Sequence, residues 1–223
     1  MIETTIEFTR YFIALLFGAA VAVSFVGMIP TTKNRIALGG LTAILFIMQI
    51  VSLRLFGMNM TIKLYPLLSH LPLAIFIVLY LKRPWLISLT SMFVSFLCYQ
   101  APRWIGTVAG QVFDSASMNH VGYIMAAFLM YYLLQKFAVK SIQHLMERSV
   151  KSCLLFGTIP AFYYLFDYAA TVYTDFMYSG ARVAVQFMPF MTSTFYFVFV
   201  LLYYTETKTS KDPKRAGYVR YAV

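Results

Sequence analysis

Seven long apolar stretches constrain the fold of this chain more than any other feature of its sequence. A membrane-spanning helix needs about 20 predominantly apolar residues to cross the hydrocarbon core of a bilayer. The stretches cover residues 11–29, 36–53, 64–81, 85–105, 121–137, 152–173 and 183–204. Hydrocarbon offers no water to backbone N–H and C=O groups, so a segment that crosses it must satisfy them internally, as a helix does. The sequence therefore predicts an all-α polytopic membrane protein with seven transmembrane helices.

The composition supports this prediction and excludes several other classes of protein. Hydrophobic residues make up 61% of the chain and charged residues only 12%, whereas a soluble domain has about 45–50% apolar and about 25% charged residues. Too little polar surface remains to cover a water-soluble globule, which excludes a soluble enzyme, a disordered chain and a disulfide scaffold. We expect a multi-pass protein of the cell (plasma) membrane, in contact with the lipid bilayer.

The basic residues predict the orientation in the membrane. If alternate connections face the same side, 13 of the 18 lysines and arginines fall on one side and five on the other. The five are Arg10, Arg54, Lys63, Arg103 and Arg182. Cytoplasmic connections carry the excess of positive charge, so the N-terminus is expected outside and the C-terminus in the cytoplasm. Anionic lipid headgroups then account for the net charge of +10, and no nucleic-acid partner is expected.

One membrane domain accounts for nearly the whole sequence. Residues 1–205 form the predicted seven-helix domain, and residues 206–223 form a short basic cytoplasmic tail. Glu3, Glu7 and the lone Arg10 do not make the positive start of a signal peptide, so we expect the first apolar stretch to stay in the mature protein. The two longest connections, 107–120 outside and 138–151 inside, are expected to be loops, with His144 a solvated residue of the second.

Polar side chains inside the apolar stretches are costly in a membrane and therefore informative about function. They are Gln49, Arg54, His70, Gln100, Arg103, Asp167 and Gln186. With the predicted orientation, all seven fall in the outer half of the membrane. Pro72, Pro102 and Pro189 follow three of them closely, and a proline inside a helix removes a hydrogen bond and kinks the helix.

The sixth stretch adds a polar stripe at helical spacing. Tyr164, Asp167, Thr171 and Thr174 lie three or four residues apart and so share one face of a regular helix. Together with the kinked helices, this stripe predicts a polar cavity open to the outside. The candidate ligand-binding residues are His70, Gln100, Arg103, Tyr164, Asp167, Thr171 and Gln186.

Structural interpretations of the same residues are also open. Asp167 needs a partner, and Arg103 is the candidate, so the two form either part of a binding site or a purely structural ion pair. Arg54 and Arg103 are alternatively side chains that snorkel to the outer headgroups. His70 alone would be read as a hydrogen-bonded core histidine. Gly106 and Gly110 are spaced for close helix packing but fall near a predicted helix end.

Catalytic and metal-binding patterns are absent from the sequence. It contains no HExxH zinc motif, no GxSxG nucleophile elbow and no glycine-rich nucleotide loop. Cys98 and Cys153 lie in different stretches without metal-ligand spacing. We therefore expect no enzyme activity in this chain, no catalytic residue, no metal and no cofactor.

Three segments carry a resemblance to a known family. They are residues 63–73 (KLYPLLSHLPL), 82–85 (KRPW) and 100–106 (QAPRWIG). In these segments the chain resembles the N-terminal transmembrane sensor region of Firmicutes sensor histidine kinases of the GHKL type, which are quorum-sensing-like. The resemblance implies an extracellular small-molecule or peptide ligand, a homodimer, and a cytoplasmic kinase domain or response regulator as partners. Only 19 residues follow Tyr204, without a phospho-acceptor box or ATP site, so the kinase core is absent from this sequence.

The function expected from these features is that of a membrane sensor module of a two-component-type signalling protein. A ligand would bind in the outward-facing polar cavity and act on the cytoplasmic side through a rearrangement of the helices. A small-solute transporter or channel is the first alternative, although the inner halves of the stretches offer few polar residues beyond Ser88 and Ser91. An assembly subunit of a membrane complex is the second alternative.

Overall fold

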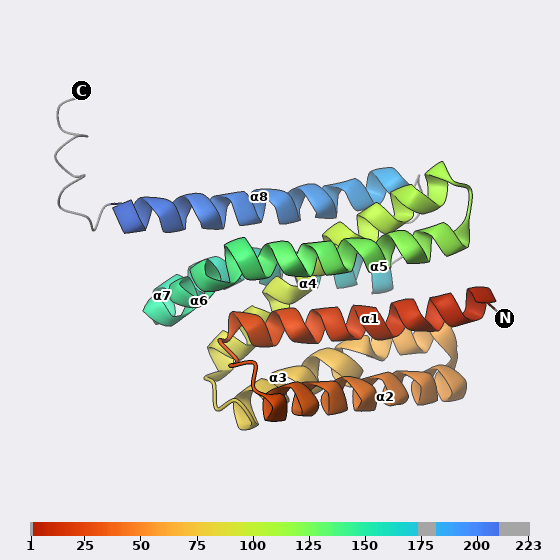
Figure 1. Ribbon diagram of the computed structural model, residues 1–223, viewed down its shortest axis with the longest axis horizontal. Coiled ribbons are helices and arrows are strands. Elements are labelled where there is room, and N and C mark those ends of the chain that lie inside the picture. The colour runs from red at the N-terminus through yellow and green to blue at the C-terminus, as the bar shows by residue number, and fades with distance from the viewer. Residues whose placement is uncertain (1, 174–181, 210–223) are drawn as a thin grey trace.

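The computed structural model describes residues 2–173 and 182–209, and every regular element in these ranges is a helix. The helices are α1 (Ile2–Phe25), α2 (Thr32–Tyr65), α3 (Leu71–Leu79), α4 (Trp85–Val112), α5 (Ala116–Leu133), α6 (Val139–Arg148), α7 (Val150–Asp167) and α8 (Arg182–Thr209). Three π-helical segments, Pro66–His70, Leu134–Ala138 and Tyr168–Tyr173, adjoin α2, α5 and α7. The long helices run along one direction as a bundle, with the N-terminus at one end and the end of α8 at the other (Figure 1). The all-α prediction is confirmed.

Four helical stretches in the described residues are long and apolar enough to cross a membrane. They are Thr5–Phe25, Thr32–Leu79, Ala116–Arg148 and Phe187–Thr205. The predicted stretches 85–105 and 152–173 are also helical, in α4 and in α7 with the π-helical segment that follows it. These lengths and compositions are those of a membrane protein.

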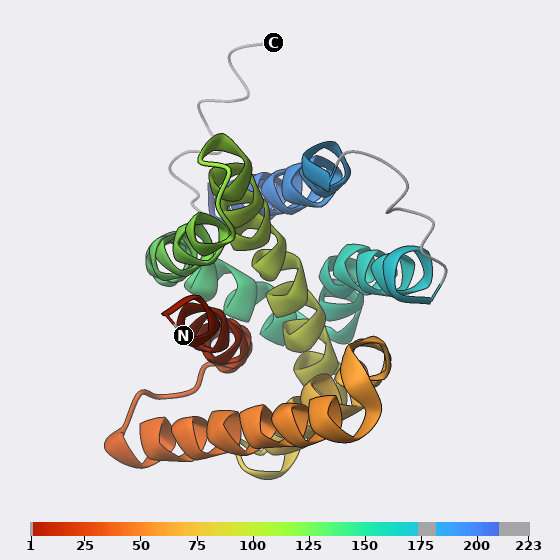
Figure 2. The ribbon, with the colours of Figure 1, turned by 90° about the vertical axis from the view of Figure 1, so that its right-hand side faces the viewer.

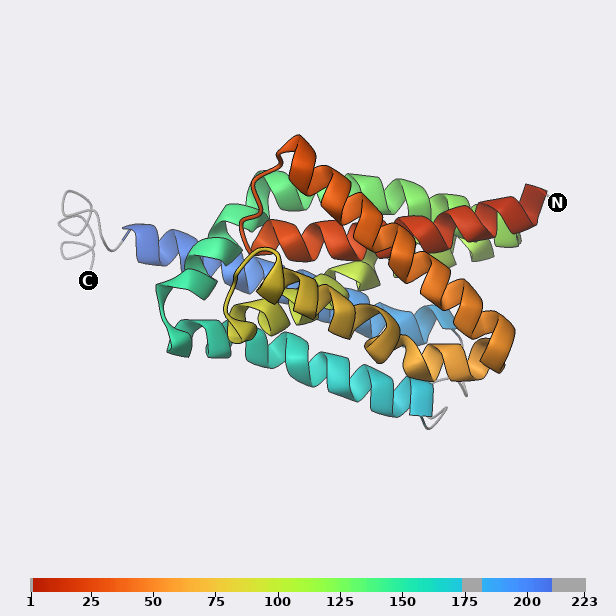
Figure 3. The same cartoon turned by 90° about the horizontal axis from the view of Figure 1, so that it is seen from below.

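The longest of these stretches is a hairpin. A straight helix over its 48 residues would be about 72 Å long, more than twice the roughly 30 Å of a bilayer core. The backbone of Gly57, with φ 75° and ψ 175°, interrupts the helix. The Gln49 side-chain amide donates to Ser69 Oγ at 2.7 Å, and the hydroxyls of Ser52 and Thr61 lie 3.0 Å apart. The chain therefore folds back at Gly57, and stretches 36–53 and 64–81 lie side by side (Figure 3).

The turn at Gly57 gives a first testable prediction. Its backbone conformation is one that essentially only glycine adopts, whereas an added Cβ would meet no atom within 4 Å. We expect Gly57→Ala to lower the free energy of unfolding by about 1–3 kcal/mol through backbone strain alone, measured by SDS-induced unfolding in mixed micelles. Gly39→Ala is the matched control, because Gly39 is helical and equally open. Equal effects of the two substitutions would contradict the prediction.

Helix α4 occupies the centre of the bundle, with α1, α5, α7 and α8 around it (Figure 2). The main core cluster includes Phe25, Val94, Leu97, Tyr123 and Phe156, from α1, α4, α5 and α7. The buried serines of α4 donate to carbonyl oxygens of the preceding turn: Ser88 to Pro84, Ser91 to Ser88 and Ser95 to Met92. Their hydroxyls are thereby satisfied within the helix, so small polar residues are compatible with a central position.

The predicted outer loop 107–120 is wrong in extent. Helix α4 continues to Val112 and α5 begins at Ala116, which leaves three residues between the helices. Close packing explains the longer helices, because a Cβ on Gly106 would lie 2.8 Å from the backbone oxygen of Asn119. The glycines therefore serve helix packing, one of the two interpretations of their spacing.

The predicted inner loop 138–151 is also corrected, since most of it forms α6. This helix is amphipathic and buries Ile142, Leu145 and Met146 against the bundle. Its polar side chains tie it to neighbouring elements, because Glu147 forms an ion pair with Arg83 at 3.0 Å and the Gln143 amide donates to the Ser24 carbonyl. His144, expected in a loop, lies on α6 with its ring 5.9 Å from that of Tyr204 on α8.

Candidate ligand-binding site

The polar residues singled out in the sequence lie between the middle of the bundle, where His70 packs against Phe96 of α4, and one end of the bundle. This end holds the start of α1, the turn at Gly57, the connection between α4 and α5, and the start of α8 (Figure 1). His70 ends the π-helical segment before α3, Gln100 and Arg103 lie on α4, and Tyr164 and Asp167 lie on α7. Segments distant in sequence thus contribute to one region.

His70 is held where two prolines distort the helix. Pro72 cannot donate a backbone hydrogen bond, and in the segment before it the Leu71 N–H donates to the carbonyl of Pro66, five residues back, as in a π-helix. The predicted irregularity beside His70 therefore takes the form of a π turn. Ser69, on the same turn, bonds to Gln49 and not to its neighbour His70.

Aromatic rings enclose the His70 side chain. His70 Nδ1 and the Tyr164 hydroxyl form a hydrogen bond of 2.8 Å between the π turn and α7. The rings of Tyr65, Phe96, Tyr164 and Tyr168 lie edge-on to the imidazole, with centroids 5.0, 5.7, 5.2 and 6.4 Å away. His70 is thus both hydrogen-bonded, as the structural interpretation required, and placed within the predicted cluster.

Asp167 and Arg103 lie on neighbouring helices, α7 and α4. The Asp167 side chain is buried, with 8% of its surface exposed, and the Arg103 guanidinium acts on its carboxyl electrostatically. The sequence proposed Arg103 as the partner of Asp167, and this pairing stays a prediction. Arg54, in contrast, is exposed on α2 near the turn, as expected of a side chain that snorkels to headgroups.

Gln100 and Trp104 place two buried N–H donors on one face of α4. Gln100 is 2% exposed, and neither its Nε2 nor Trp104 Nε1 has a hydrogen-bond partner among the described residues. The Trp104 indole stacks on Phe190 of α8 with centroids 4.5 Å apart, and Phe187 lies 5.7 Å away. Buried donors normally find a partner, so this pair requires an explanation.

Two predicted site residues are placed only by their backbone. Thr171 belongs to the π-helical segment Tyr168–Tyr173 and Gln186 to α8, but their side chains lie outside the described part of the structure. Thr174, the last member of the predicted stripe, also lies outside the described residues. The regular helix ends at Asp167, so the assumed helical period does not hold over the π-helical residues Tyr168–Tyr173, which include Thr171.

A second polar group in this region was missed by the sequence analysis. The Arg10 guanidinium donates to His120 Nδ1 at 3.2 Å and lies over the Tyr123 ring, 5.2 Å from its centroid. Arg103 also acts electrostatically on Tyr123. The signal available in the sequence was the position of Arg10 at the border of the first apolar stretch, where a charged side chain can turn toward the protein.

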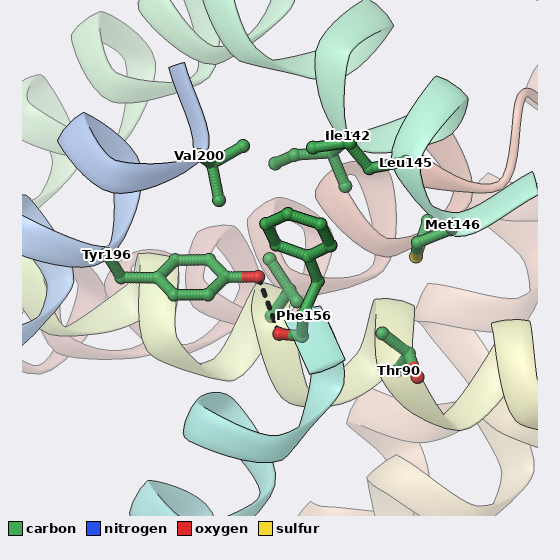
Figure 4. Close-up of a pocket in the computed structure, with 8 residues that line it drawn as sticks. Thr90, Ile142, Leu145, Met146, Phe156, Tyr196 and Val200 are labelled. Carbon is green, nitrogen blue, oxygen red and sulfur yellow. Dashed lines mark hydrogen bonds between the residues drawn. The ribbon is translucent and has the colours of Figure 1, made fainter. Parts of the chain in front are cut away.

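The other half of the bundle is closely packed. Figure 4 shows a pocket there, lined by Thr90, Val94, Ile142, Leu145, Met146, Phe156, Tyr196 and Val200. It leaves no room for a water molecule, and the Tyr196 hydroxyl donates across it to the carbonyl of Phe156 at 2.9 Å. None of the candidate site residues lines this pocket.

Comparison with protein-family models, with curated proteins and with solved structures finds no match to this chain. The function is therefore inferred from the chemical groups of the site. The site combines buried hydrogen-bond donors, an interacting acid and base, and aromatic walls. Such an arrangement suits the binding of a molecule that has both polar and apolar parts.

Proposed function

We propose that this chain is a seven-span sensor module of the cell membrane, with its N-terminus outside and its C-terminus in the cytoplasm. The seven spans are α1, the two arms of the hairpin through α2 and α3, α4, α5, α7 and α8. The reversal at Gly57 supports counting the hairpin as two spans. The 13 basic residues on one side support the orientation.

The ligand in this proposal is an extracellular small molecule or peptide. The observation that carries it is the hydrogen bond between His70 and Tyr164 beside Phe96. From there Gln100 and Arg103 on α4 and Asp167 on α7 follow toward the end of the bundle that this orientation places outside. In the other half of the bundle, the apolar pocket around Phe156 leaves no room for a water molecule. Such packing favours a receptor over a channel or carrier.

Helix α8 is the proposed route of the signal. It contacts the site through Phe187 and Phe190, which lie against Trp104, and it contacts α6 through Tyr204 and His144. A ligand that displaces the beginning of α8 would bias the packing of its far end, because a helix transmits displacement along its axis. The resemblance to sensor histidine kinases suggests a dimeric cytoplasmic kinase domain or response regulator as the recipient.

Thiol accessibility tests the outward-facing site. In a Cys98→Ala, Cys153→Ala background, we expect a membrane-impermeant thiol reagent added to intact cells to label His70→Cys, because the proposed cavity opens to the outside. Val94→Cys should stay unlabelled, since Val94 is fully buried in the closed half. Lys140→Cys, exposed on α6, should be labelled only after permeabilisation. Labelling of His70→Cys only after permeabilisation would overturn the proposed orientation and with it the extracellular site.

A further inference from the structure

The unpaired donors of Gln100 and Trp104 indicate what kind of ligand the site takes. The two residues are one helical turn apart on α4, about 6 Å along its axis, and so share a face. A buried donor without a partner costs about 1–3 kcal/mol, and the surface of both atoms is buried. Both groups are N–H donors, so the molecule that would satisfy them must present acceptor oxygens.

The charges next to these donors favour a neutral ligand. Arg103 lies three residues after Gln100 on α4, and the buried Asp167 lies on the neighbouring α7, so the region holds one basic and one acidic side chain. A carboxylate ligand would meet the negative charge of Asp167, and an ammonium ligand would meet Arg103. A neutral carbonyl oxygen accepts a hydrogen bond without either repulsion.

The walls of the same region are aromatic. Phe96 lies one turn before Gln100 and faces His70 and Tyr164, while Phe187 and Phe190 of α8 cover Trp104. Pro189 lies between these two phenylalanines, inside α8. An interior proline removes a backbone hydrogen bond, so this part of α8 can be displaced from Trp104 at reduced cost.

We propose that the site binds a neutral, hydrophobic molecule bearing amide or ester carbonyls, which accept hydrogen bonds from Gln100 Nε2 and Trp104 Nε1 between α4 and α8. This inference rests on the proposed function and specifies its ligand. The ligand inserts apolar groups beside Phe187 and Phe190. It pairs donors that the unliganded protein leaves unpaired, and the gain drives the displacement of α8.

The experiment uses the full chain in lipid nanodiscs with Trp85→Phe. The chain has two tryptophans, so Trp104 then becomes the sole indole reporter, and Trp85 is half-exposed at the other end of α4. The probes are N-acetyl-leucyl-leucinamide, which is neutral, and N-acetyl-leucyl-leucine, which carries a carboxylate. We expect a saturable change in Trp104 emission with the amide and at least about tenfold weaker binding of the acid. Gln100→Met should weaken binding of the amide by about tenfold, the loss of one hydrogen bond.

Stability of the unliganded variant provides an independent readout. Replacing an unpaired buried donor by an apolar side chain of similar size should leave the thermal midpoint of Gln100→Met equal to or above that of the parent. A lower midpoint would mean that Gln100 is paired at rest and would overturn the inference. So would the absence of a saturable signal with the amide, or equal affinities of the parent and Gln100→Met for it.

Failure of this inference is distinguishable from failure of the proposed function. If the acid binds more tightly than the amide while His70→Cys is labelled from outside, only the neutral ligand class is wrong. If His70→Cys is labelled only after permeabilisation, the extracellular site is wrong whatever the peptides do.

Discussion

Arg103→Gln is expected to lower the free energy of unfolding by about 1–3 kcal/mol, because it removes a positive charge that acts electrostatically on the buried Asp167 carboxyl. Unfolding by SDS in mixed micelles, followed by circular dichroism, measures the loss. Arg54→Gln is the matched control, since Arg54 is exposed on α2, and its effect should stay within about 0.5 kcal/mol. Similar effects of the two substitutions would contradict a buried interaction at Arg103.

The double variant Arg103→Met, Asp167→Leu decides between the two interpretations of this pair. Replacing both members of a buried ion pair by apolar side chains is often neutral for stability, so we expect it to regain most of what Arg103→Gln loses. If the pair belongs to the binding site, the double variant should bind N-acetyl-leucyl-leucinamide about tenfold more weakly than the parent. Unchanged binding would assign Arg103 and Asp167 a purely structural role.

Hydropathy located the helices but not their ends. It follows the cost of placing side chains in lipid, whereas a helix ends where its backbone hydrogen bonds end. Helix α4 therefore extends past the apolar stretch 85–105 to Val112, and α8 extends past Tyr204 to Thr209, into the predicted tail.

Helix α6 was missed for another reason. Ile142, Leu145 and Met146 form an amphipathic pattern in a segment too polar to count as a span.

The sequence predicts those residues of the candidate site whose side chains are energetically unfavourable inside a membrane. A histidine, an arginine and a carboxylate are rare in apolar stretches, so the sequence singles out His70, Arg103 and Asp167, and their shared depth in the membrane stays a prediction. The aromatic enclosure of His70 did not, because the chain has 21 phenylalanines and 17 tyrosines and nothing in their spacing distinguishes Phe96 or Tyr168. The π-helical segment after Asp167 was not predicted either, because the spacing of the residues was interpreted with the period of a regular α-helix.

The second large effect is expected where α4 and α5 touch. An added Cβ on Gly122 would lie 2.7 Å from the Cβ of Ala109 and 3.4 Å from the Cα of Gly106. A Cβ cannot rotate away as the end of a long side chain can, so the helices must separate. This contact lies next to Tyr123, which is fully buried and supports the Arg10 guanidinium. Separation of α4 and α5 would therefore also disturb the polar region at this end of the bundle.

We expect Gly122→Ala to lower the free energy of unfolding by about 1–3 kcal/mol, the usual cost of overpacking. Gly18→Ala is the control, because its Cβ would meet no atom within 4 Å and alanine is the better helix former by up to about 1 kcal/mol. Ala109→Gly removes the methyl group that Gly122→Ala would strike. The double variant should therefore be about as stable as Ala109→Gly alone, measured by SDS-induced unfolding. Losses that simply add would show that the two positions do not touch, since independent sites are additive.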